Sequence, residues 1–326
     1  MKIGRREFIK LCGLIGAKVL LLPSSSCTLR KNKPSKAESA GLMPKHTLGK
    51  TGRKVSIIGV GGMAMAKLDQ QYVNRFMAKS IELGINYFDV APTYGDSEIK
   101  YGKALKPYCK DIFLACKTTE RTAAGAKKEL DRSLERLQTD HLDLYQFHAI
   151  NNLEKDVDVI FGKGGALETF LDARRNGIIR SIGFSSHSDK AALEAMRRFD
   201  FDTIMFPVNF AAQYKANFVA DVAAEAKKRG VGLIAIKSLA YQRWPKDADT
   251  SKYPTCWYQP IDTPELAKLA LAWSYAQGAD AILPPGDAGL VRLAMGLAPQ
   301  ALRTDPKEFT KLREIADTIE HPIFPT

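Results

Sequence analysis

Eight short apolar runs alternate with longer amphipathic runs along this chain of 326 residues, and this alternation limits its fold more than any other feature. Each short run is rich in Val, Ile, Leu, Phe or Tyr and is bounded by Gly, Pro, Asn or Asp, as β-strands are. The predicted strands are residues 55–60, 87–90, 112–116, 142–147, 181–184, 203–208, 232–236 and 281–283. Eight strands, each followed by a helix, are what a closed α/β barrel of the (β/α)8 TIM type requires. No Gly-x-Gly-x-x-Gly turn follows the first strand, which argues against an open doubly wound sheet.

The runs between the strands have helical periodicity. Residues 126–137 place three leucines on one stripe with charged residues opposite. Residues 218–229 end at Gly230, in the manner of helices that are followed by a C′ glycine. The composition does not change within residues 46–326, so we predict one barrel domain there, with residues 46–56 as a hairpin that closes its bottom.

The first 27 residues are typical of an export signal rather than of a folded domain. Arg-Arg-Glu-Phe-Ile-Lys at residues 5–10 precedes an apolar run at residues 11–22 that is too short to span a membrane. This layout resembles a twin-arginine signal peptide. We therefore expect residues 1–27 to be recognised by the twin-arginine (Tat) export machinery, and the protein to lie in the periplasm or cell envelope.

Cys27 follows Pro23 and three serines, which resembles a lipoprotein processing site. Two alternatives remain here: Cys27 is lipidated and anchors the protein to the membrane, or the chain is cleaved nearby and Cys27 has no role. Residues 28–45 are rich in Lys, Ser, Pro, Ala and Glu, which predicts a flexible tether between the signal and the barrel.

Net charge and cysteine content exclude several classes of protein. Residues 1–40 carry +7 of the chain's net charge of +12, and the remaining +5 is not gathered in a basic block. Nucleic-acid binding is therefore not expected. Beyond the tether the cysteines are Cys109, Cys116 and Cys256, an odd number without short spacing, which argues against a disulfide framework and against a metal site.

Four ionisable side chains fall at or just beyond the C-terminal ends of three successive predicted strands. They are Asp89, Tyr94, Lys117 and His148. In a TIM barrel these strand ends surround the active site. Each residue alone has a structural explanation, as a turn residue, loop packing, a solvated charge or a cap, but their common position predicts a catalytic group.

The motifs around these residues resemble the aldo-keto reductases over nearly the whole of residues 46–295. The matching stretches are LGKTGRKVSIIGVGG, GINYFDVAPTYGDSE, ACKTTE, LDLYQFH and IRSIGFSSH, in this order. The resemblance implies that Tyr94 is the proton donor, that Lys117 activates it, that Asp89 is the counter-ion of the lysine and that His148 orients the carbonyl group. It also implies a nicotinamide cofactor, NADP or NAD, and no metal.

This assignment agrees with the chemistry of carbonyl reduction. Hydride delivered to a carbonyl carbon leaves negative charge on the oxygen, which a proton donor must neutralise. The ordinary pKa of a phenol is about 10, and we expect the ammonium of Lys117 to lower that of Tyr94. Since no side chain supplies a hydride, the cofactor must do so.

The residues expected to bind the cofactor depart from the family pattern. Ser185 and Ser186 stand where the family commonly has Ser-Asn to hold the nicotinamide amide. Lys237 resembles a family variant in which a lysine replaces the residue next to the tyrosine that stacks on the nicotinamide ring, and we expect it to reach a phosphate. Gly286 opens a helix whose free N–H groups suit an anion.

Two further cofactor candidates have open alternatives. Asn209 either contacts the cofactor or caps the sixth strand. Arg292 either replaces the family's missing phosphate-binding residues or is a surface charge of its helix. The aromatic loop at residues 240–262 either stacks against a sugar or aromatic carbonyl substrate or packs against the barrel itself.

The sequence thus predicts an oxidoreductase that interconverts a small carbonyl compound, such as an aldehyde, ketone or sugar, and an alcohol. The main alternative is a non-catalytic, cofactor-binding or sensing barrel of the cell envelope. A hydrolase with paired carboxylates ranks last, because Asp89 has no second acid at an equivalent strand end.

Overall fold

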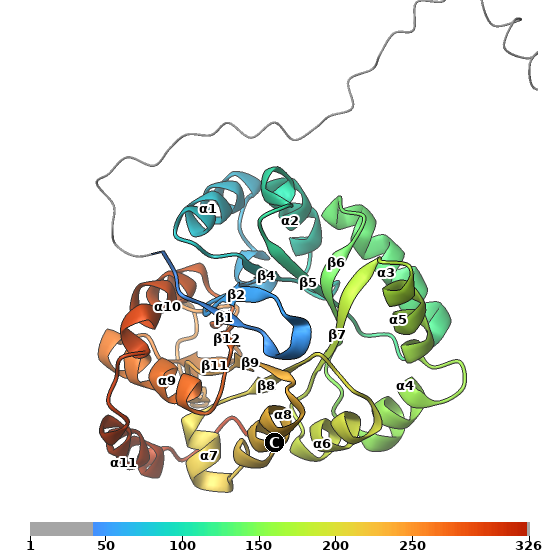
Figure 1. Cartoon of the computed structure of the whole chain (residues 1–326). Coiled ribbons are helices and arrows are strands. Elements are labelled where there is room, and N and C mark those ends of the chain that lie inside the picture. The colour runs from blue at the N-terminus through green and yellow to red at the C-terminus, as the bar shows by residue number, and fades with distance from the viewer. Residues whose placement is uncertain (1–41, 325–326) are drawn as a thin grey trace, which may run out of the picture. The chain divides into compact units, whose positions relative to one another are not determined.

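The computed structural model describes residues 42–324, and these contain a (β/α)8 barrel (Figure 1). Its eight parallel strands are β3 (Val60–Gly61), β4 (Tyr87–Asp89), β5 (Phe113–Thr118), β6 (Leu142–Phe147), β7 (Ile179–Ser185), β8 (Thr203–Pro207), β9 (Gly232–Ile236) and β12 (Ala281–Ile282). A parallel bridge between Ile58 and Ile282 joins the two edges, so the sheet closes. The predicted fold class is therefore confirmed.

Helices surround the sheet, as Figure 1 shows from the end at which the strands begin. They are α1 (Gln70–Glu82), α2 (Ser97–Leu105), α3 (Ala123–Leu137), α4 (Val159–Phe161), α5 (Ala166–Arg175), α6 (Asp189–Arg198), α7 (Phe210–Ala216), α8 (Ala220–Arg229), α9 (Pro264–Ala276), α10 (Ala288–Ala301) and α11 (Thr310–Thr318). The predicted helices correspond to α3 and α8, and Gly230 adopts the left-handed conformation (φ 66°) that ends α8. Within residues 42–324 no helix is long and apolar enough to cross a membrane.

The prediction that residues 55–60 form one strand is wrong. Its first part belongs to β2 (Lys54–Ser56), which pairs antiparallel with β1 (Lys45–Thr47), and its end belongs to β3. The chain bends between them, where the Ser56 hydroxyl donates to the Ile58 carbonyl at 2.7 Å. Periodicity cannot reveal this break, because the side chains on both sides of the bend are buried.

The β1–β2 hairpin closes the bottom of the barrel, as predicted. Leu48, at its turn, is fully buried, and Gly49 lies so close to the backbone of Gly232 that a Cβ atom there would collide with it. Leu48 belongs to an apolar cluster inside the barrel; its members are Leu48, Val55, Tyr87, Phe113, Ala115, Leu144, Met205, Ile234, Ala281 and Leu283. Apolar side chains thus fill the interior of the barrel beneath its mouth.

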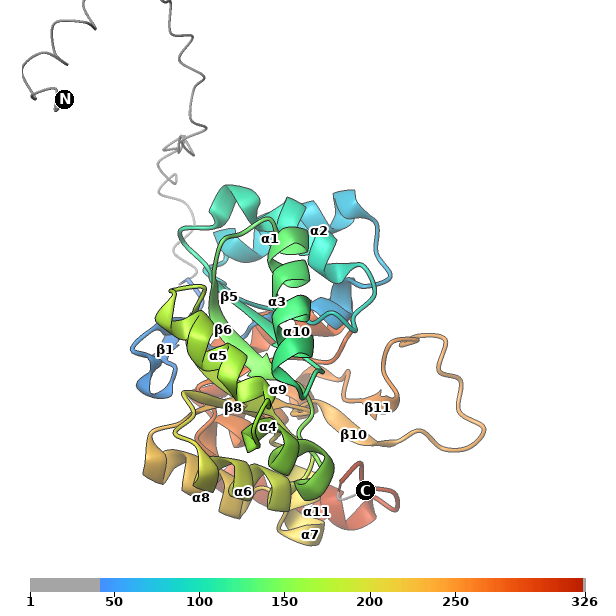
Figure 2. The same ribbon diagram turned by 90° about the vertical axis from the view of Figure 1, so that its right-hand side faces the viewer.

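Residues 240–262, predicted to be a loop, contain a second hairpin. Strands β10 (Ala240–Arg243) and β11 (Tyr258–Pro260) pair antiparallel. The hairpin projects from the barrel end opposite β1 (Figure 2). The C-terminal segment packs against it, since the Arg243 N–H donates to the His321 carbonyl at 2.9 Å. The aromatic loop therefore has a framework that holds it over the mouth of the barrel.

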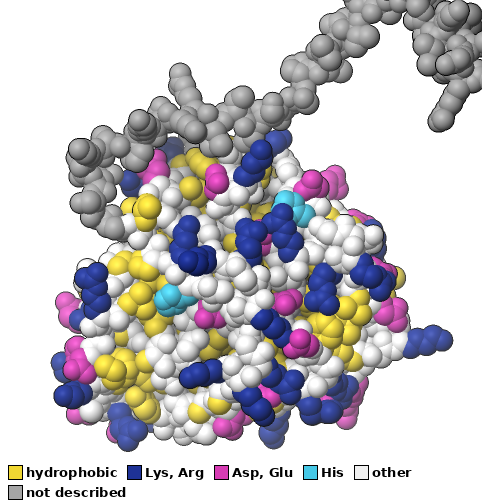
Figure 3. All heavy atoms as spheres, viewed as in Figure 1, with side chains coloured by type: hydrophobic (Ala, Val, Ile, Leu, Met, Phe, Trp, Pro, Cys, Tyr) yellow, Lys and Arg dark blue, Asp and Glu magenta, His cyan; other side chains and the backbone are white. Residues whose placement is uncertain are grey.

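The surface charges of the barrel are mixed. On the face drawn in Figure 3, lysines and arginines alternate with aspartates and glutamates. On that face no single-sign stripe of the kind that tracks a phosphate backbone is apparent.

Candidate active site

A buried ion pair lies at the floor of the barrel mouth. Asp89, the last residue of β4, accepts a hydrogen bond from the ammonium of Lys117, from β5. Both side chains are almost completely buried. Burial by itself lowers the pKa of Lys117, but the carboxylate of Asp89 raises it, and the net pKa lies above the ordinary value. Lys117 is therefore a charged ammonium held in a dry site.

Two residues that the sequence analysis did not single out complete this ion pair. The Gln146 amide donates to the second carboxylate oxygen of Asp89 at 3.0 Å, and the Tyr87 hydroxyl donates to it at 3.4 Å. Gln146 lies two residues before His148, on the same inward face of β6, so the period of two along a strand was a signal for it. Buried charges persist only when their remaining lone pairs are satisfied, and these two donors do so for Asp89.

Tyr94 lies above the ion pair, in the loop between β4 and α2. The Lys117 ammonium is 5.4 Å from the centre of its ring. Burial raises the pKa of Tyr94, and the opposing charge of Lys117 does not outweigh this effect. The expected net lowering of this pKa is therefore wrong: Lys117 acts in that direction, but the desolvated phenol is the stable form. Tyr94 is consequently a neutral hydroxyl at physiological pH, able to donate its proton.

His148 stands beside Tyr94 at the end of β6. The two rings meet edge to face, with centroids 5.8 Å apart and planes at 89°. Burial lowers the pKa of His148 to about 3, helped by the positive charges of Lys117 and Arg121. Its buried Nδ1 atom has no hydrogen-bond partner among the described residues. His148 is therefore a neutral imidazole with hydrogen-bonding capacity left for a ligand.

A cavity of about 240 Å³ opens above these side chains. Asp89, Tyr94 and His148 border it, so three of the four predicted catalytic residues face one space, with Lys117 directly beneath. Its other walls are mainly apolar or aromatic; they include Met63, Met205, Ile236, Trp257, Tyr258 and Leu283. A mostly apolar cavity with a few convergent polar groups is typical of a small-molecule site.

The two serines predicted to bind the nicotinamide differ in position. Ser185 borders the cavity, and its hydroxyl accepts a hydrogen bond from the Ala149 N–H at 2.8 Å. Ser186 is fully buried and does not border the cavity. Its hydroxyl donates to the Ser188 carbonyl and accepts from the Ser188 N–H. The structure thus leaves Ser185, rather than Ser186, in a position to meet a ligand.

Asn209 is a structural cap. Its amide donates to the carbonyls of Lys237 and Ala240 at 3.1 and 2.8 Å, and its carbonyl oxygen accepts from the Ala212 N–H at the start of α7. It is fully buried and does not border the cavity. Of the two alternatives for this residue, the structure shows the cap, and the amide already has its partners.

Lys237 borders the cavity without a carboxylate partner among the described residues. Its ammonium lies 5.2 Å from the ring centre of Trp257 and 4.8 Å from that of Tyr258. Burial lowers its pKa to about 8. Its backbone has a positive φ of 61°, which is uncommon outside glycine. This cation is therefore available to an anionic ligand at the barrel mouth.

Gly286 borders the same cavity, but the helix that follows is not an open anion site. Asp287 precedes α10, and its carboxylate accepts from the N–H groups of Gly289 and Leu290 at 2.8 and 3.0 Å. The predicted free N–H groups are thus partly satisfied by a negative side chain. The Gly286 carbonyl in turn accepts a hydrogen bond from the Thr255 hydroxyl.

Arg292 lies away from the mouth, on α10. Its guanidinium donates to the Tyr72 hydroxyl at 2.6 Å and stacks over the rings of Tyr72 and Phe76, which belong to α1. It borders a different cavity from the one above the ion pair. The structure therefore does not place Arg292 with the other cofactor candidates; it lies at the helical surface of the barrel.

Comparison with known proteins agrees with this geometry. Residues 57–255 match the model of the family described as "Aldo/keto reductase family". The uncharacterized oxidoreductase YqkF of Bacillus subtilis is 30% identical over 177 residues, which cover 50% of this chain and 55% of the relative. L-Galactose dehydrogenase of Arabidopsis thaliana is 28% identical over 210 residues, covering 59% of this chain and 64% of the relative. The chain spans about half the length of the curated relatives it matches.

A solved structure gives the same result for the fold. The aldo-keto reductase AKR11C1 from Bacillus halodurans, in its holo form, superposes with a TM-score of 0.64 at 26% identity. The match covers 84% of this chain and 95% of that one. The barrel and the succession of its strands are thus shared along most of both chains.

Proposed function

The chain belongs to the aldo/keto reductase family, and from this premise we propose that it is a nicotinamide-dependent oxidoreductase that interconverts a carbonyl group and an alcohol, with Tyr94 as the general acid and base. The observation that carries the proposal is the buried Lys117–Asp89 ion pair beneath a neutral Tyr94, with neutral His148 beside it. A barrel that only binds has no need to bury a charged pair under a phenol.

The cavity suits the nicotinamide end of a dinucleotide. Met205, Ile236 and Leu283 offer an apolar wall, and the Ser185 hydroxyl is at hand for the amide. The uncompensated ammonium of Lys237 suits a phosphate. The start of α10 is unsuited to a phosphate, because the carboxylate of Asp287 already accepts from an N–H group there. We therefore assign phosphate binding to Lys237, with NADP or NAD as the cofactor.

The side chains have separate tasks in the reduction. When bound here, a nicotinamide would supply the hydride that carbonyl reduction needs. Tyr94 donates its proton to the carbonyl oxygen, and Lys117 stabilises the resulting phenolate charge. Asp89 keeps Lys117 charged and in place. In the oxidative direction the same Tyr94 oxygen accepts the alcohol proton.

His148 orients the substrate. As a neutral imidazole it can donate one hydrogen bond to the same carbonyl oxygen that Tyr94 protonates, which fixes the face presented to the cofactor. A protonated imidazolium would add a third positive charge to a site that already contains Lys117 and Lys237. The lowered pKa of His148 is consistent with the neutral role.

We propose a sugar or small aldehyde as the substrate class. Trp257, with 52% of its surface exposed, borders the cavity. Aromatic faces stack on sugar rings and on aromatic carbonyl compounds. The relative from Arabidopsis is named a sugar dehydrogenase, which supports this choice.

Turnover of a carbonyl and alcohol panel tests the proposal. Sugars, aldehydes and ketones are offered with reduced NADP or NAD, and the corresponding alcohols and aldoses with the oxidised forms, while nicotinamide absorbance is followed. A change in nicotinamide absorbance that requires both the substrate and the enzyme supports the proposal. Cofactor binding without turnover of any member favours the alternative, a non-catalytic cofactor-binding barrel.

We further propose that the protein is exported through the twin-arginine route and acts in the periplasm or cell envelope. The residues that carry this proposal, Arg5, Arg6 and the possible lipid site Cys27, lie outside the described residues. Fractionation of the host with an Arg5→Lys, Arg6→Lys variant tests it. The variant should accumulate in the cytoplasm, and an unchanged envelope location would contradict the proposal.

A further inference from the structure

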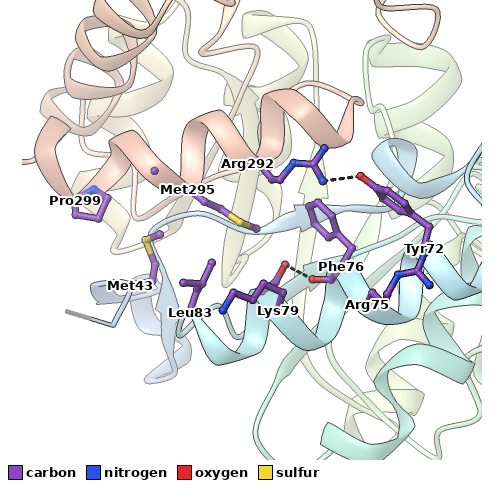
Figure 4. A pocket seen from close by; sticks show the side chains of 11 residues that line it. Met43, Tyr72, Arg75, Phe76, Lys79, Leu83, Arg292, Met295 and Pro299 are labelled. Atoms are coloured by element: carbon purple, nitrogen blue, oxygen red, sulfur yellow. Dashed lines mark hydrogen bonds between the residues drawn. The ribbon is translucent and has the colours of Figure 1, made fainter. Parts of the chain in front are cut away.

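A second cavity lies outside the barrel, between α1 and α10. Its volume of about 540 Å³ is within the range of small-molecule sites. It is lined by residues of α1 and α10 together with Met43 and Leu83, and Figure 4 draws their side chains. None of them borders the cavity at the barrel mouth.

The lining has two chemically different ends. Tyr72, Arg75 and Arg292 gather at one end in Figure 4, whereas Met43, Leu83 and Pro299 lie toward the other. Met295 and Phe76 form apolar surface between them. Arg292 and Pro299 are seven residues apart on one helix, so the trough is roughly 10 Å long. This is the layout of a site for a ligand with a polar head and an apolar tail.

The polar end is positively charged, and none of the described residues that line the cavity is acidic. Arg75 makes no hydrogen bond or ion pair with another described residue. Lys79 points toward Leu83, at the other end, in Figure 4 and lies 3.3 Å from Glu82, an exposed neighbour on its own helix that partly offsets its charge. An anionic head group would therefore be attracted to Arg75 and Arg292.

Arg292 is positioned in advance for such a group. Its guanidinium lies 5.9 and 5.6 Å from the ring centres of Tyr72 and Phe76, and the Tyr72 hydroxyl accepts one of its N–H groups. These contacts use the faces of the guanidinium and one of its N–H donors, so further N–H donors remain for a ligand. A cation held in this way loses little rotamer freedom when it binds a carboxylate.

The α10 residues that line the trough are unusual in a helix. Gly296 and Pro299 both lie within α10, although they are the least favourable residues for a helix interior. A Cβ atom at Gly296 would meet nothing within 4 Å, so close packing does not explain this glycine. The absent side chain leaves the trough open instead.

We propose that this trough binds a single-chain anionic amphiphile, a long-chain carboxylate whose head group meets Arg75 and Arg292 and whose chain lies over Met295, Met43 and Leu83. The residues that precede the trough are a poor occupant. Residues 28–41 contain four lysines and arginines and one glutamate, so they carry the same sign of charge as the rim. The site is separate from the barrel mouth and does not depend on the reaction there.

Calorimetric titration of the full chain with decanoate tests the proposal. Decanoate should bind at one site with a negative heat-capacity change, which marks burial of apolar surface. Acetate, which has the head group alone, should not bind. Decanol and decyltrimethylammonium, which have the tail without the negative charge, should bind at least about tenfold more weakly. Equal affinity for decanol would overturn the role of the arginines.

Variants separate this site from nonspecific binding. Gly296→Leu should fill the trough and abolish decanoate binding, while Gly296→Ala, its matched control, should retain most of it. Both variants should be at least as stable as the parent, since each replaces a helix glycine by a better helix former. Arg75→Gln and Arg292→Gln should each weaken binding about tenfold, and Lys128→Gln, on α3, should have no effect.

Three results would overturn the proposal. Decanoate binding that survives Gly296→Leu would place the ligand elsewhere. A change of oligomeric state in Gly296→Leu would identify the trough as a contact between copies of the chain. Binding of anionic phospholipid vesicles that is lost in Gly296→Leu, without binding of free decanoate, would identify a membrane surface instead. Nucleotide affinity, measured in parallel, should be unchanged in every variant.

Discussion

The imidazole of His148 meets the phenol of Tyr94 edge to face, with ring centroids 5.8 Å apart. The Lys117 ammonium lies 5.4 Å from the same phenol ring, and Asp89 is paired with that ammonium. These four residues come from three successive strands and the loop after the first of them. A ligand oxygen that contacts the Tyr94 hydroxyl therefore also lies near the His148 ring. Carbonyl reduction requires such an arrangement, because both groups act on the same oxygen.

Replacement of Tyr94 by Phe should abolish proton transfer and leave binding intact. We expect kcat to fall by about 10²- to 10⁴-fold, because a general acid contributes that much. The nucleotide dissociation constant should not change. Steady-state kinetics and a fluorescence titration measure the two quantities, with Tyr108→Phe as the control on a distant tyrosine. Full activity of Tyr94→Phe would remove the tyrosine from the mechanism.

Replacement of Lys117 by Met should destabilise the barrel, because it leaves the Asp89 carboxylate buried without its cation. Loss of one partner of a buried ion pair costs about 3–5 kcal/mol of the free energy of unfolding. The double variant Lys117→Met, Asp89→Asn should regain most of this stability but no activity. Urea denaturation provides the measurement. A double variant as unstable as the single one would show that Asp89 is not the source of the loss.

The pKa of His148, about 3, predicts how stability depends on pH. Its ordinary pKa is about 6.5, so the unfolded chain binds a proton that the native protein does not between these two values. The stabilising effect is complete above pH 6.5 and is lost as the pH falls toward 3. The loss amounts to at most about 1.4 kcal/mol per pH unit.

Two measurements check this prediction. The ring signals of His148 in an NMR titration should show no protonation between pH 8 and pH 5. His148→Gln should flatten the decline of the free energy of unfolding below pH 6.5, although His187, whose pKa burial lowers to about 4, will still contribute. Titration of His148 near pH 6.5 would contradict the buried, neutral state.

Lys237 should make nucleotide binding pH-dependent. Burial lowers its pKa to about 8, so it is cationic below pH 8 and becomes neutral above it. Affinity for the cofactor, measured by titration, should therefore fall as the pH rises through this range. Lys237→Arg should remove the pH dependence and Lys237→Met should weaken binding at every pH. Equal affinity of wild type and Lys237→Met would show that this cation does not meet the phosphate.

Much of the fold could be predicted because the signals were local. The bounds of β6 and β9 follow directly from apolar runs ended by turn residues, and α8 ends at its glycine. The break between β2 and β3 could not be predicted, since it depends on pairing between Lys45–Thr47 and Lys54–Ser56 rather than on composition.

The catalytic candidates could be placed together because strand ends in a barrel share one edge. The surroundings that set the pKa values of these residues could not be predicted. The pKa of Tyr94 depends on how much of the ring is buried, and the sequence does not contain that quantity. Likewise, the partners of Asn209 are carbonyls from Lys237 and Ala240, about thirty residues further along the chain, and the neighbours of Arg292 lie on α1.

Native mass spectrometry of the protein purified from the envelope of its own host tests whether it carries a nicotinamide nucleotide. We expect one bound NADP or NAD per chain, or an empty protein that takes up one of them on titration, with weaker uptake by Lys237→Met. An empty protein that binds neither nucleotide at any concentration tried would contradict the assignment as a nicotinamide-dependent oxidoreductase.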